Sequence, residues 1–380
     1  MKEKDYAVYL DIINNTVIPS AATTEEQTKL MRPLLKWLDT HTPPKLYKFR
    51  ECNENNINAF RNQQIWFATG AKMNDDYDAV LYCNREAILH ELSNQFDENG
   101  MLKVFSFLQT GREAPAILYG IFGRQYIEET AEKIQSISEA ELRRISSGIK
   151  AWAEEGFRTQ FPFIAQSIQN VVKISSFSEN INSPLMWGHY AKNSSGFALA
   201  YDFRHRHYNE CPSCEKLGVT CTAPKLCTLM PIIYRNNRID ATEFARYLMQ
   251  QSFTQNLCKE MKTRDEMSTK ILSTVTCSDT FMQSKIIHSK YRDWDDEKEW
   301  RMTVSYNAPS CATDQTAYIW RKPCALYLGR NIKDTDELVL RNIAYTQRIP
   351  VYKMEIDETS TGYDLKPIKQ RNTRKELVLK

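Results

Sequence analysis

The sequence predicts an α+β fold with helical insertions, and two observations support this prediction. Stretches with the two-residue alternation of a β-strand occur in the early, middle and late parts of the chain. Amphipathic stretches with helical spacing separate them, and no internal repeat indicates a solenoid. Strands that are separated by helical blocks in this way are typical of a sheet that carries helices on its connections.

An N-terminal helical segment is expected over residues 1–42. The run Thr-Thr-Glu-Glu at 23–26 supplies a helix cap followed by acidic residues in the first turn. Leucines then recur at helical spacing between Leu30 and Leu38, and the prolines after Thr42 end the helix.

One large domain is expected over residues 43–365. A short helix is expected at 53–61, and the predicted strands cover 46–50, 64–69, 171–178, 196–203, 325–329 and 351–356. Two insertions interrupt this pattern: a helical insertion over about 86–170 and a Cys-rich and helical insertion over about 205–285. Residues 366–380 are polar and basic, and we expect them to form a tail.

The composition is that of an ordinary globular protein. The 380 residues provide ample material for a core, and the net charge of +3 does not by itself demand a nucleic-acid partner. Because no apolar run is long enough for a signal peptide or a membrane span, we expect a cytoplasmic protein without membrane association. In reducing surroundings the ten cysteines are expected to be free thiols or metal ligands rather than disulfides.

The segment 293–304 alternates charged and bulky residues. As a strand it would place Glu297, Glu299 and Arg301 on an exposed face and bury Trp300 on the other. Two carboxylates on one face form a candidate acid/base or cation-stabilising pair. The alternative is a solvated strand face with modest surface ion pairs.

Three further polar residues lie on predicted strands that precede this pair. Arg50 could hold a diphosphate, because its guanidinium binds phosphate oxygens in a bidentate manner. Ser176 and Ser178 could fix a ribose oxygen or a neighbouring backbone group, and a carboxylate beside the ribose would favour an oxocarbenium-like transition state. The alternative is a surface arginine and two serines that are satisfied by the backbone.

Several short blocks form a recognisable set: Leu-Tyr-Lys-Phe-Arg at 46–50, Ile-Trp-Phe-Ala at 65–68, Ser-Phe-Ser-Glu at 176–179, Leu-Met-Trp-Gly-His-Tyr-Ala at 185–191, Gly-Phe at 196–197 and Glu-Lys-Glu-Trp-Arg at 297–301. These blocks resemble a bacterial family of unknown function, DUF2971, and through it the ADP-ribosyltransferase superfamily in its arginine, serine, glutamate form. The similarity is greatest to bacterial enzymes that ADP-ribosylate single-stranded DNA. The serine motif reads Ser-Phe-Ser where the superfamily has Ser-Thr-Ser.

The resemblance implies a split β-sheet core and a mono-ADP-ribosyltransferase that uses NAD as a substrate. It implies the following roles: Glu299 as the catalytic glutamate, Glu297 as the residue that orients the acceptor, Arg50 at the NAD diphosphate, Ser176 or Ser178 in the serine role, and Trp187 or Tyr190 against the nicotinamide. It also implies a toxin or anti-phage effector, with a neutralising antitoxin as a possible partner.

The expected acceptor is a macromolecule, with nucleic acid (DNA or RNA) preferred over protein. Basic clusters at 235–238 and 285–292 are interleaved with Tyr234, Tyr291 and Trp294. Such a combination could follow a phosphate backbone while the aromatic rings stack on bases. The alternative is a set of solvated surface charges.

A structural zinc site is possible in the Cys-rich insertion. Cys211 and Cys214 have the C-x-x-C spacing of a zinc knuckle, and Cys221 and Cys227 could complete a tetrahedral shell. The alternative is four free thiols.

Two other functional classes remain open from the sequence. The first is a non-catalytic nucleic-acid-binding protein built on the zinc knuckle and the basic clusters. The second is a metal-dependent nuclease in which Asp75, Asp76, Glu297 and Glu299 gather a divalent ion, because carboxylate oxygens are the ligands that Mg²⁺ prefers.

Overall fold

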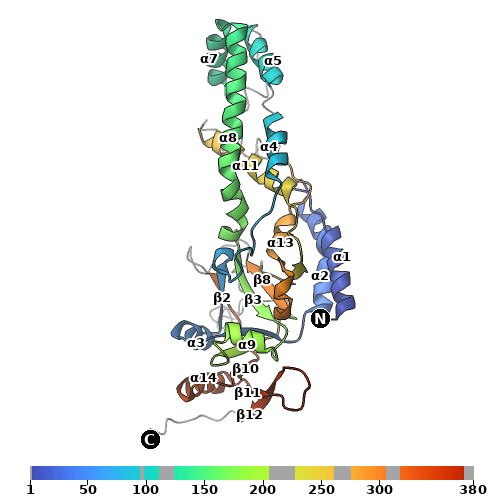
Figure 1. Ribbon diagram of the computed structural model, residues 1–380, viewed down its shortest axis with the longest axis vertical. Coiled ribbons are helices and arrows are strands. Elements are labelled where there is room, and N and C mark those ends of the chain that lie inside the picture. Colours follow the sequence, from blue (N-terminus) through green and yellow to red (C-terminus); the bar gives the residue numbers. More distant parts are fainter. Residues whose placement is uncertain are drawn as a thin grey trace.

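The computed structural model describes residues 2–94, 98–110, 124–204, 227–260, 275–304 and 317–371. These residues form a mixed β-sheet and several helices, so the predicted α+β class is confirmed. A long helix projects from the sheet and gives the molecule an elongated shape (Figure 1).

The main sheet has ten strands and is mixed. Eight strands follow one another in the order β12 (Leu365–Gln370), β11 (Val351–Ile356), β10 (Ala325–Leu328), β4 (Phe197–Tyr201), β1 (Leu46–Arg50), β3 (Lys173–Ser178), β2 (Gln64–Thr69) and β9 (Ala317–Trp320). β8 (Glu299–Val304) runs antiparallel to β3 and joins it to β5 (Cys227–Pro231). β10 and β11 are parallel. A second, parallel pair consists of β6 (Ile233–Arg235) and β7 (Ser289–Tyr291).

The sheet divides at β3. β8 pairs with all six residues of β3, so β1 and β2 share the other edge of that strand. β2 pairs with it at Lys173 and Ile174, and β1 pairs with it at Ser178. Between these pairings the Nζ atom of Lys48 donates a hydrogen bond to the carbonyl oxygen of Ser176 over 3.0 Å. The division therefore leaves an opening between β1 and β2, with β3 as its floor.

The N-terminal segment forms two helices that pack on the sheet, α1 (Glu3–Asn15) and α2 (Thr24–His41). The predicted cap of α2 is confirmed, because Thr23 and Glu26 form a reciprocal capping box. Tyr9 is buried among core residues of the sheet and donates to the carbonyl oxygen of Pro231 over 2.8 Å. Burial of these helix faces joins the first 42 residues to the main core.

The segment from 86 to 170 is helical over its described residues, with α4 (Arg85–Asn94), α5 (Glu98–Gln109), α7 (Arg124–Gln135) and α8 (Glu139–Val171). The Ser138 hydroxyl caps α8, which then runs for 33 residues. Near the sheet α8 buries Phe157, Phe161 and Ile164 in a core that it shares with α4 and α11 (Thr242–Glu260). Its far end lies with α5 and α7, away from the sheet (Figure 1).

Shorter elements complete the fold: α3 (Glu54–Arg61), the 3-10 turn η1 (Gly70–Lys72), α9 (Pro184–Tyr190), α13 (Met282–Ile287), the 3-10 turn η2 (Arg292–Glu297) and α14 (Asp334–Gln347). The strands predicted at 46–50 and 64–69 are confirmed. The expectation of a tail from residue 366 is wrong at its start, because β12 pairs with β11 as far as Gln370.

The acidic segment 293–304 differs from its prediction in two ways. Its first part is the turn η2, and Lys298 adopts a left-handed conformation (φ 43°) before β8 begins at Glu299. The expected exposed face is also wrong, because Glu299 is only 4% and Arg301 only 1% exposed. β8 is a central strand between β3 and β5, and α13 covers its charged side, where Arg301 donates to the carbonyl oxygen of Ile287.

Candidate active site

A cavity of about 330 Å³ occupies the opening between β1 and β2. Its walls come from β1, β2, β3, α9, β7, η2 and β8, which are far apart in the sequence. The charged and hydroxyl-bearing side chains on these walls belong to Tyr47, Lys48, Arg50, Lys72, Asp78, Ser176, Ser178, Tyr190, Lys290, Glu297, Glu299 and Arg301. The structure therefore brings Arg50, both serines, Tyr190 and both glutamates to one cavity.

One wall of the cavity is cationic. Lys48 and Arg50 are two residues apart on β1, so both side chains point to the same face. Burial lowers the pKa of Arg50, and burial together with the charge of Arg50 lowers the pKa of Lys48 well below its usual value. Among the residues that the structure describes, no carboxylate forms an ion pair with Arg50. Its guanidinium is thus available to an anionic ligand.

The opposite side is built around Glu299. Arg301 donates from Nε to Glu299 Oε1 over 2.8 Å and from its Nη2 atom to Oε2 over 3.1 Å. The Nη2 atom of Arg301 also lies 3.1 Å from Oδ1 of the buried Asp78. Burial opposes ionisation of Glu299, but the charges of Arg301 and Lys290 outweigh it, and the pKa of Glu299 falls to about 2. Glu299 is therefore a permanent anion at neutral pH.

Glu297 has a different environment although it is only two residues away. Lys290 donates to Glu297 Oε2 over 2.7 Å, and the Tyr190 hydroxyl donates to Oε1. The Asn74 side chain fixes that hydroxyl through a 2.7 Å hydrogen bond. Burial raises the pKa of Glu297, with a further contribution from the charge of Glu299, although Lys290 opposes the shift. Two carboxylates whose pKa values are pushed apart in this way suit different chemical tasks.

The two serines differ in their neighbours. Ser176 lines the cavity and helps to lower the pKa of Glu299, so its side chain lies on the side of that carboxylate. The Ser178 hydroxyl oxygen accepts from the backbone N–H of Asn180 over 3.0 Å and holds the turn after β3. Ser176 is therefore the serine of the two that is associated with Glu299, whereas Ser178 has a local structural contact.

Trp187 does not reach the cavity, which corrects the expectation that it could contact a cofactor. Its side chain is fully buried, its ring packs edge-on against Phe49, and its Nε1 atom donates to the carbonyl oxygen of Ile181. The turn of α9 that carries Trp187 inward directs Tyr190, one helical turn later, toward the cavity.

Three cavity residues were missed as site candidates from the sequence, namely Lys48, Asp78 and Arg301, and Lys290 was expected only as part of a basic cluster for nucleic acid. Lys48 had a usable signal, because it alternates with Arg50 on the same strand. Lys290 and Asp78 had none, because only the folded chain brings β7 and the loop after η1 to β8.

The predicted zinc ligands Cys211, Cys214 and Cys221 lie outside the described residues, and Cys227 begins β5. Within the described ranges, no group of three or more histidine, cysteine or acidic side chains could hold a metal ion. Lys290 and Arg301 occupy the oxygens of Glu297 and Glu299 that a divalent ion would need. The carboxylate cluster required by the nuclease hypothesis is therefore not formed by the described residues.

Comparison with known proteins gives one match. Residues 186–302, from α9 to β8, match the family described as "Protein of unknown function (DUF2971)". This range contains Tyr190, Glu297 and Glu299, whereas Arg50 and Ser176 lie outside it. No curated protein and no solved structure matches the chain significantly. Among the described helices, none combines the length and the apolar character needed to cross a bilayer.

Proposed function

We propose that the protein is a mono-ADP-ribosyltransferase that transfers ADP-ribose from NAD to a macromolecular acceptor, preferentially nucleic acid. The observation that supports this proposal is the charge distribution of one cavity, with an unpaired Arg50 on one wall and a permanently ionised Glu299 on the other. NAD carries an anionic diphosphate and a cationic nicotinamide riboside, so its two parts are complementary to the two sides.

The cationic wall would bind the diphosphate. The planar guanidinium of Arg50 can donate two parallel hydrogen bonds to phosphate oxygens. Lys48 lies between the two charged sides, because its pKa responds to both Arg50 and Glu299. An anion in the cavity would favour the charged form of Lys48, whose pKa is otherwise depressed by burial.

The anionic side would stabilise the transition state. The bond between ribose C1′ and the nicotinamide nitrogen breaks, its electron pair leaves with the neutral nicotinamide, and positive charge develops on the ribose. A fixed carboxylate such as Glu299 lowers the energy of that charge without reorganising, because Arg301 and Ser176 already hold it. The low pKa of Glu299 keeps the charge present at neutral pH.

Glu297 would act on the acceptor. As the acceptor nucleophile bonds to C1′, its proton must be removed, and a carboxylate with a raised pKa is the better base of the two. Tyr190 and Lys290 orient the Glu297 carboxylate for this step. A toxin or anti-phage effector with a neutralising partner is the biological setting that we propose for such a reaction.

The test uses the full chain and NAD labelled in its ADP-ribose part, with single-stranded DNA, RNA and cellular protein as separate acceptors. Transfer of label is expected to one polymer, and Glu299→Gln should reduce it about a hundred-fold or more. Arg50→Ala should abolish the thermal stabilisation by NAD that a bound ligand confers, whereas Arg330→Ala, at an exposed position after β10, should retain it. The proposal would be rejected if no acceptor received label and no nicotinamide was released.

A further inference from the structure

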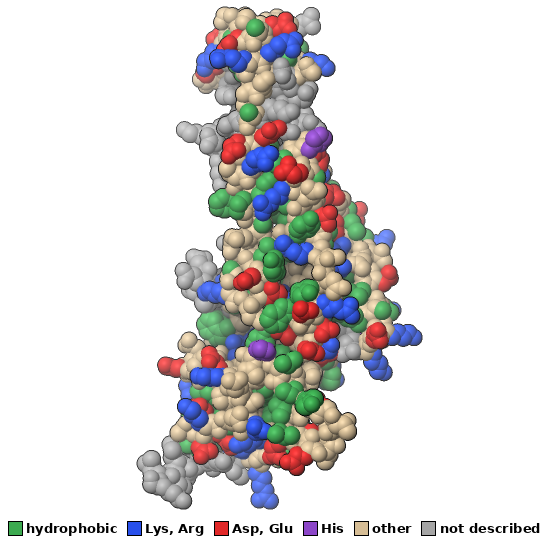
Figure 2. Space-filling model, in the orientation of Figure 1, with side chains coloured by type: hydrophobic (Ala, Val, Ile, Leu, Met, Phe, Trp, Pro, Cys, Tyr) green, Lys and Arg blue, Asp and Glu red, His purple; other side chains and the backbone are tan. Residues whose placement is uncertain are grey.

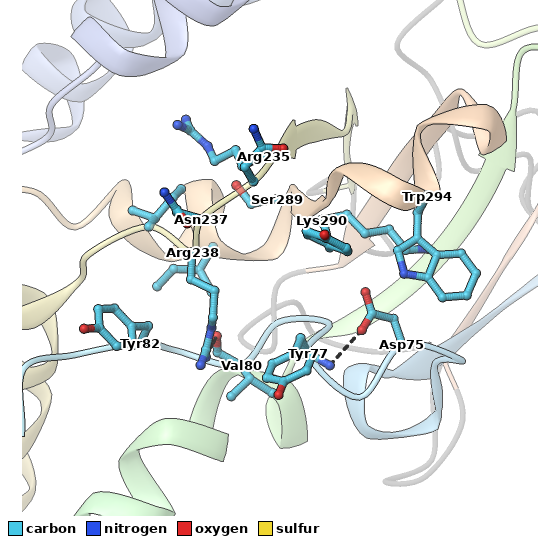
Figure 3. A pocket seen from close by; sticks show the side chains of 14 residues that line it. Asp75, Tyr77, Val80, Tyr82, Arg235, Asn237, Arg238, Ser289, Lys290 and Trp294 are labelled. Atoms are coloured by element: carbon cyan, nitrogen blue, oxygen red, sulfur yellow. Dashed lines mark hydrogen bonds between the residues drawn. The ribbon is translucent and has the colours of Figure 1, made fainter.

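A second cavity, of about 620 Å³, shares the lining residue Lys290 with the first. Figure 3 shows the side chains that line this second cavity. The loop after η1 and residues 235–239 after β6 form two of its sides, and β7 with η2 closes it. Lys290 lines both cavities: its ammonium binds Glu297 and lies 4.6 Å from the centre of the Trp294 ring. The consecutive residues Asn74 and Asp75 line the first and second cavity respectively. The two cavities therefore share a wall beside the acid pair.

The second cavity is bordered by aromatic rings that the fold leaves exposed. Tyr77 is 65% and Tyr82 46% exposed, and half of the Tyr291 surface is also accessible. Trp294 forms the wall nearest to Lys290 (Figure 3). Exposed aromatic residues gathered around one cavity mark an interaction site rather than a packing requirement. Flat, accessible rings are the surfaces on which nucleic-acid bases stack.

Cationic side chains are interspersed with these rings. The Arg238 guanidinium lies between two tyrosine rings, 5.4 Å from the centre of Tyr77 and 5.6 Å from that of Tyr82. Arg235 also lines the cavity, but its Nη2 atom donates to Asn14 Oδ1 over 3.0 Å, so its guanidinium is directed toward α1. Asp75 is the acidic residue on the lining, and its Oδ1 accepts from the Tyr77 backbone N–H over 2.9 Å (Figure 3). Lys290 is already paired with Glu297, so the cationic charge among the rings comes from Arg238, whose Nη2 atom donates to the carbonyl oxygen of Val80 over 2.7 Å.

We propose that this second cavity binds unpaired nucleotides of a single-stranded polynucleotide. The tyrosine rings would stack on bases, and Arg238 would contact a phosphate. Stacking of this kind requires bases that are released from a duplex, so the site discriminates against double strands. That the bound strand is also the acceptor rests on the proposed function, because the shared wall places a nucleotide near Trp294 beside Glu297. Binding itself does not depend on that reaction.

The experiment measures fluorescence anisotropy of labelled 20-nucleotide strands with the full chain and without NAD. Single-stranded DNA, RNA of the same sequence and the DNA duplex form the three arms. Both single strands are expected to bind more tightly than the duplex, and the difference between them identifies the preferred sugar. The double variant Tyr77→Ala, Tyr82→Ala should weaken binding about ten-fold or more, since each lost base stack contributes that order of affinity.

Three variants separate stacking and charge from folding. Replacement of both tyrosines by phenylalanine keeps the rings and should restore affinity. Arg238→Ala should flatten the dependence of affinity on salt, because each phosphate contact releases counterions. Tyr345→Ala removes a tyrosine of matched exposure, 47%, from α14 and should leave affinity unchanged.

Equal affinity in the wild type and the double alanine variant would overturn the inference, as would equal binding of the duplex or the absence of any strand binding. The outcome is independent of the proposed function. If strands bind as expected while Arg50→Ala changes no response to NAD, the second cavity stands and the transferase proposal falls. If NAD is used but the strands do not bind, the transferase proposal stands and the inference about the second cavity falls.

Discussion

Two glutamates of the same motif have opposite electrostatic surroundings. Glu299 accepts from two of the three nitrogens of a buried Arg301, whereas Glu297 shares Lys290 with it and otherwise faces a tyrosine hydroxyl. Spacing in the sequence therefore does not determine the chemistry of either carboxylate. The difference arises mainly from Arg301, which binds Glu299 alone and is itself held by Asp78, a residue far from both glutamates in the sequence.

Stability should respond very differently to removal of the two carboxylates. Glu299→Ala leaves Arg301 and Lys290 buried without their main counter-charge, so we expect a loss of about 3–5 kcal/mol in the free energy of unfolding. Glu297→Gln should cost less, because burial already disfavours its charge. Urea denaturation at pH 7 measures both. A loss of activity in Glu299→Ala must therefore be compared with that in Glu299→Gln. If Glu299→Ala and Glu297→Gln were equally stable, the buried ion network would be contradicted.

A second residue-scale prediction concerns His288. Burial lowers its pKa from 6.5 to about 4, while its Nδ1 atom lies 2.9 Å from the carbonyl oxygen of Ser284. Because the unfolded histidine binds a proton at higher pH than the folded one, its stabilising contribution is complete above about pH 6.5. It declines as the pH falls toward 4, by about 3 kcal/mol at most.

Urea titrations between pH 7 and pH 4.5 should therefore show a smaller decline of stability in His288→Gln than in the wild type. The comparison with the wild type is needed because the pKa of Glu297 is raised by burial. Protonation of such a carboxylate increases stability as the pH falls, whereas protonation of His288 decreases it. Identical pH profiles would show that His288 is not buried as a neutral ring.

At the scale of elements, one glycine sets the distance between β1 and the turn before β4. A Cβ atom on Gly196 would lie 2.1 Å from the carbonyl oxygen of Arg50. Only a residue without a side chain allows this approach, so Gly196 positions the strand end that carries the cationic wall.

Gly196→Ala should displace the end of β1 and reduce the free energy of unfolding by about 1–3 kcal/mol, the usual cost of overpacking. It should also weaken the thermal stabilisation by NAD, because Arg50 moves with the strand. Gly188→Ala is the matched control: nothing lies within 4 Å of its Cβ position, and it is within α9. Alanine there should be neutral or slightly stabilising. A Gly196→Ala protein as stable as the control would contradict the packing described.

The sequence located several elements but not their surroundings, and it missed β12 and the turn η2. Alternation located β1 and β2, and helical spacing located the block that contains α8. The same alternation misassigned the charged side of β8 to solvent, because a buried ion network and a hydrated face have the same residue types. Only the packing of α13 over Arg301 distinguishes them. Likewise, the sequence could not separate Trp187 from Tyr190, since both are aromatic residues on one short helix.

At the scale of the whole molecule, charge and shape have separate consequences. Acidic and basic side chains are interspersed along the face shown in Figure 2, in keeping with the net charge of +3. A general electrostatic field is therefore weak, and recognition of a polyanion must come from local groups such as those of the second cavity.

The elongated shape is measurable in solution. A compact chain of 380 residues would have a radius of gyration of about 21 Å. Because α8 carries α5 and α7 away from the sheet (Figure 1), small-angle X-ray scattering should give a larger value and an asymmetric distance distribution. A value near that of a sphere would show that the helical arm folds back on the sheet.

The connection between α8 and β3 also has a mechanical consequence. The helix ends at Val171 and β3 begins at Lys173, so the arm is almost continuous with the floor of the first cavity. With 33 residues the helix is about 50 Å long, so a tilt of a few degrees about its base displaces the tip by several ångströms. Pro162 lacks the N–H that would donate to the carbonyl oxygen of Arg158. The helix α8 is therefore easiest to bend at that turn. Binding of another molecule to the distal helices would thus act through α8 on the position of β3, the strand that carries Ser176.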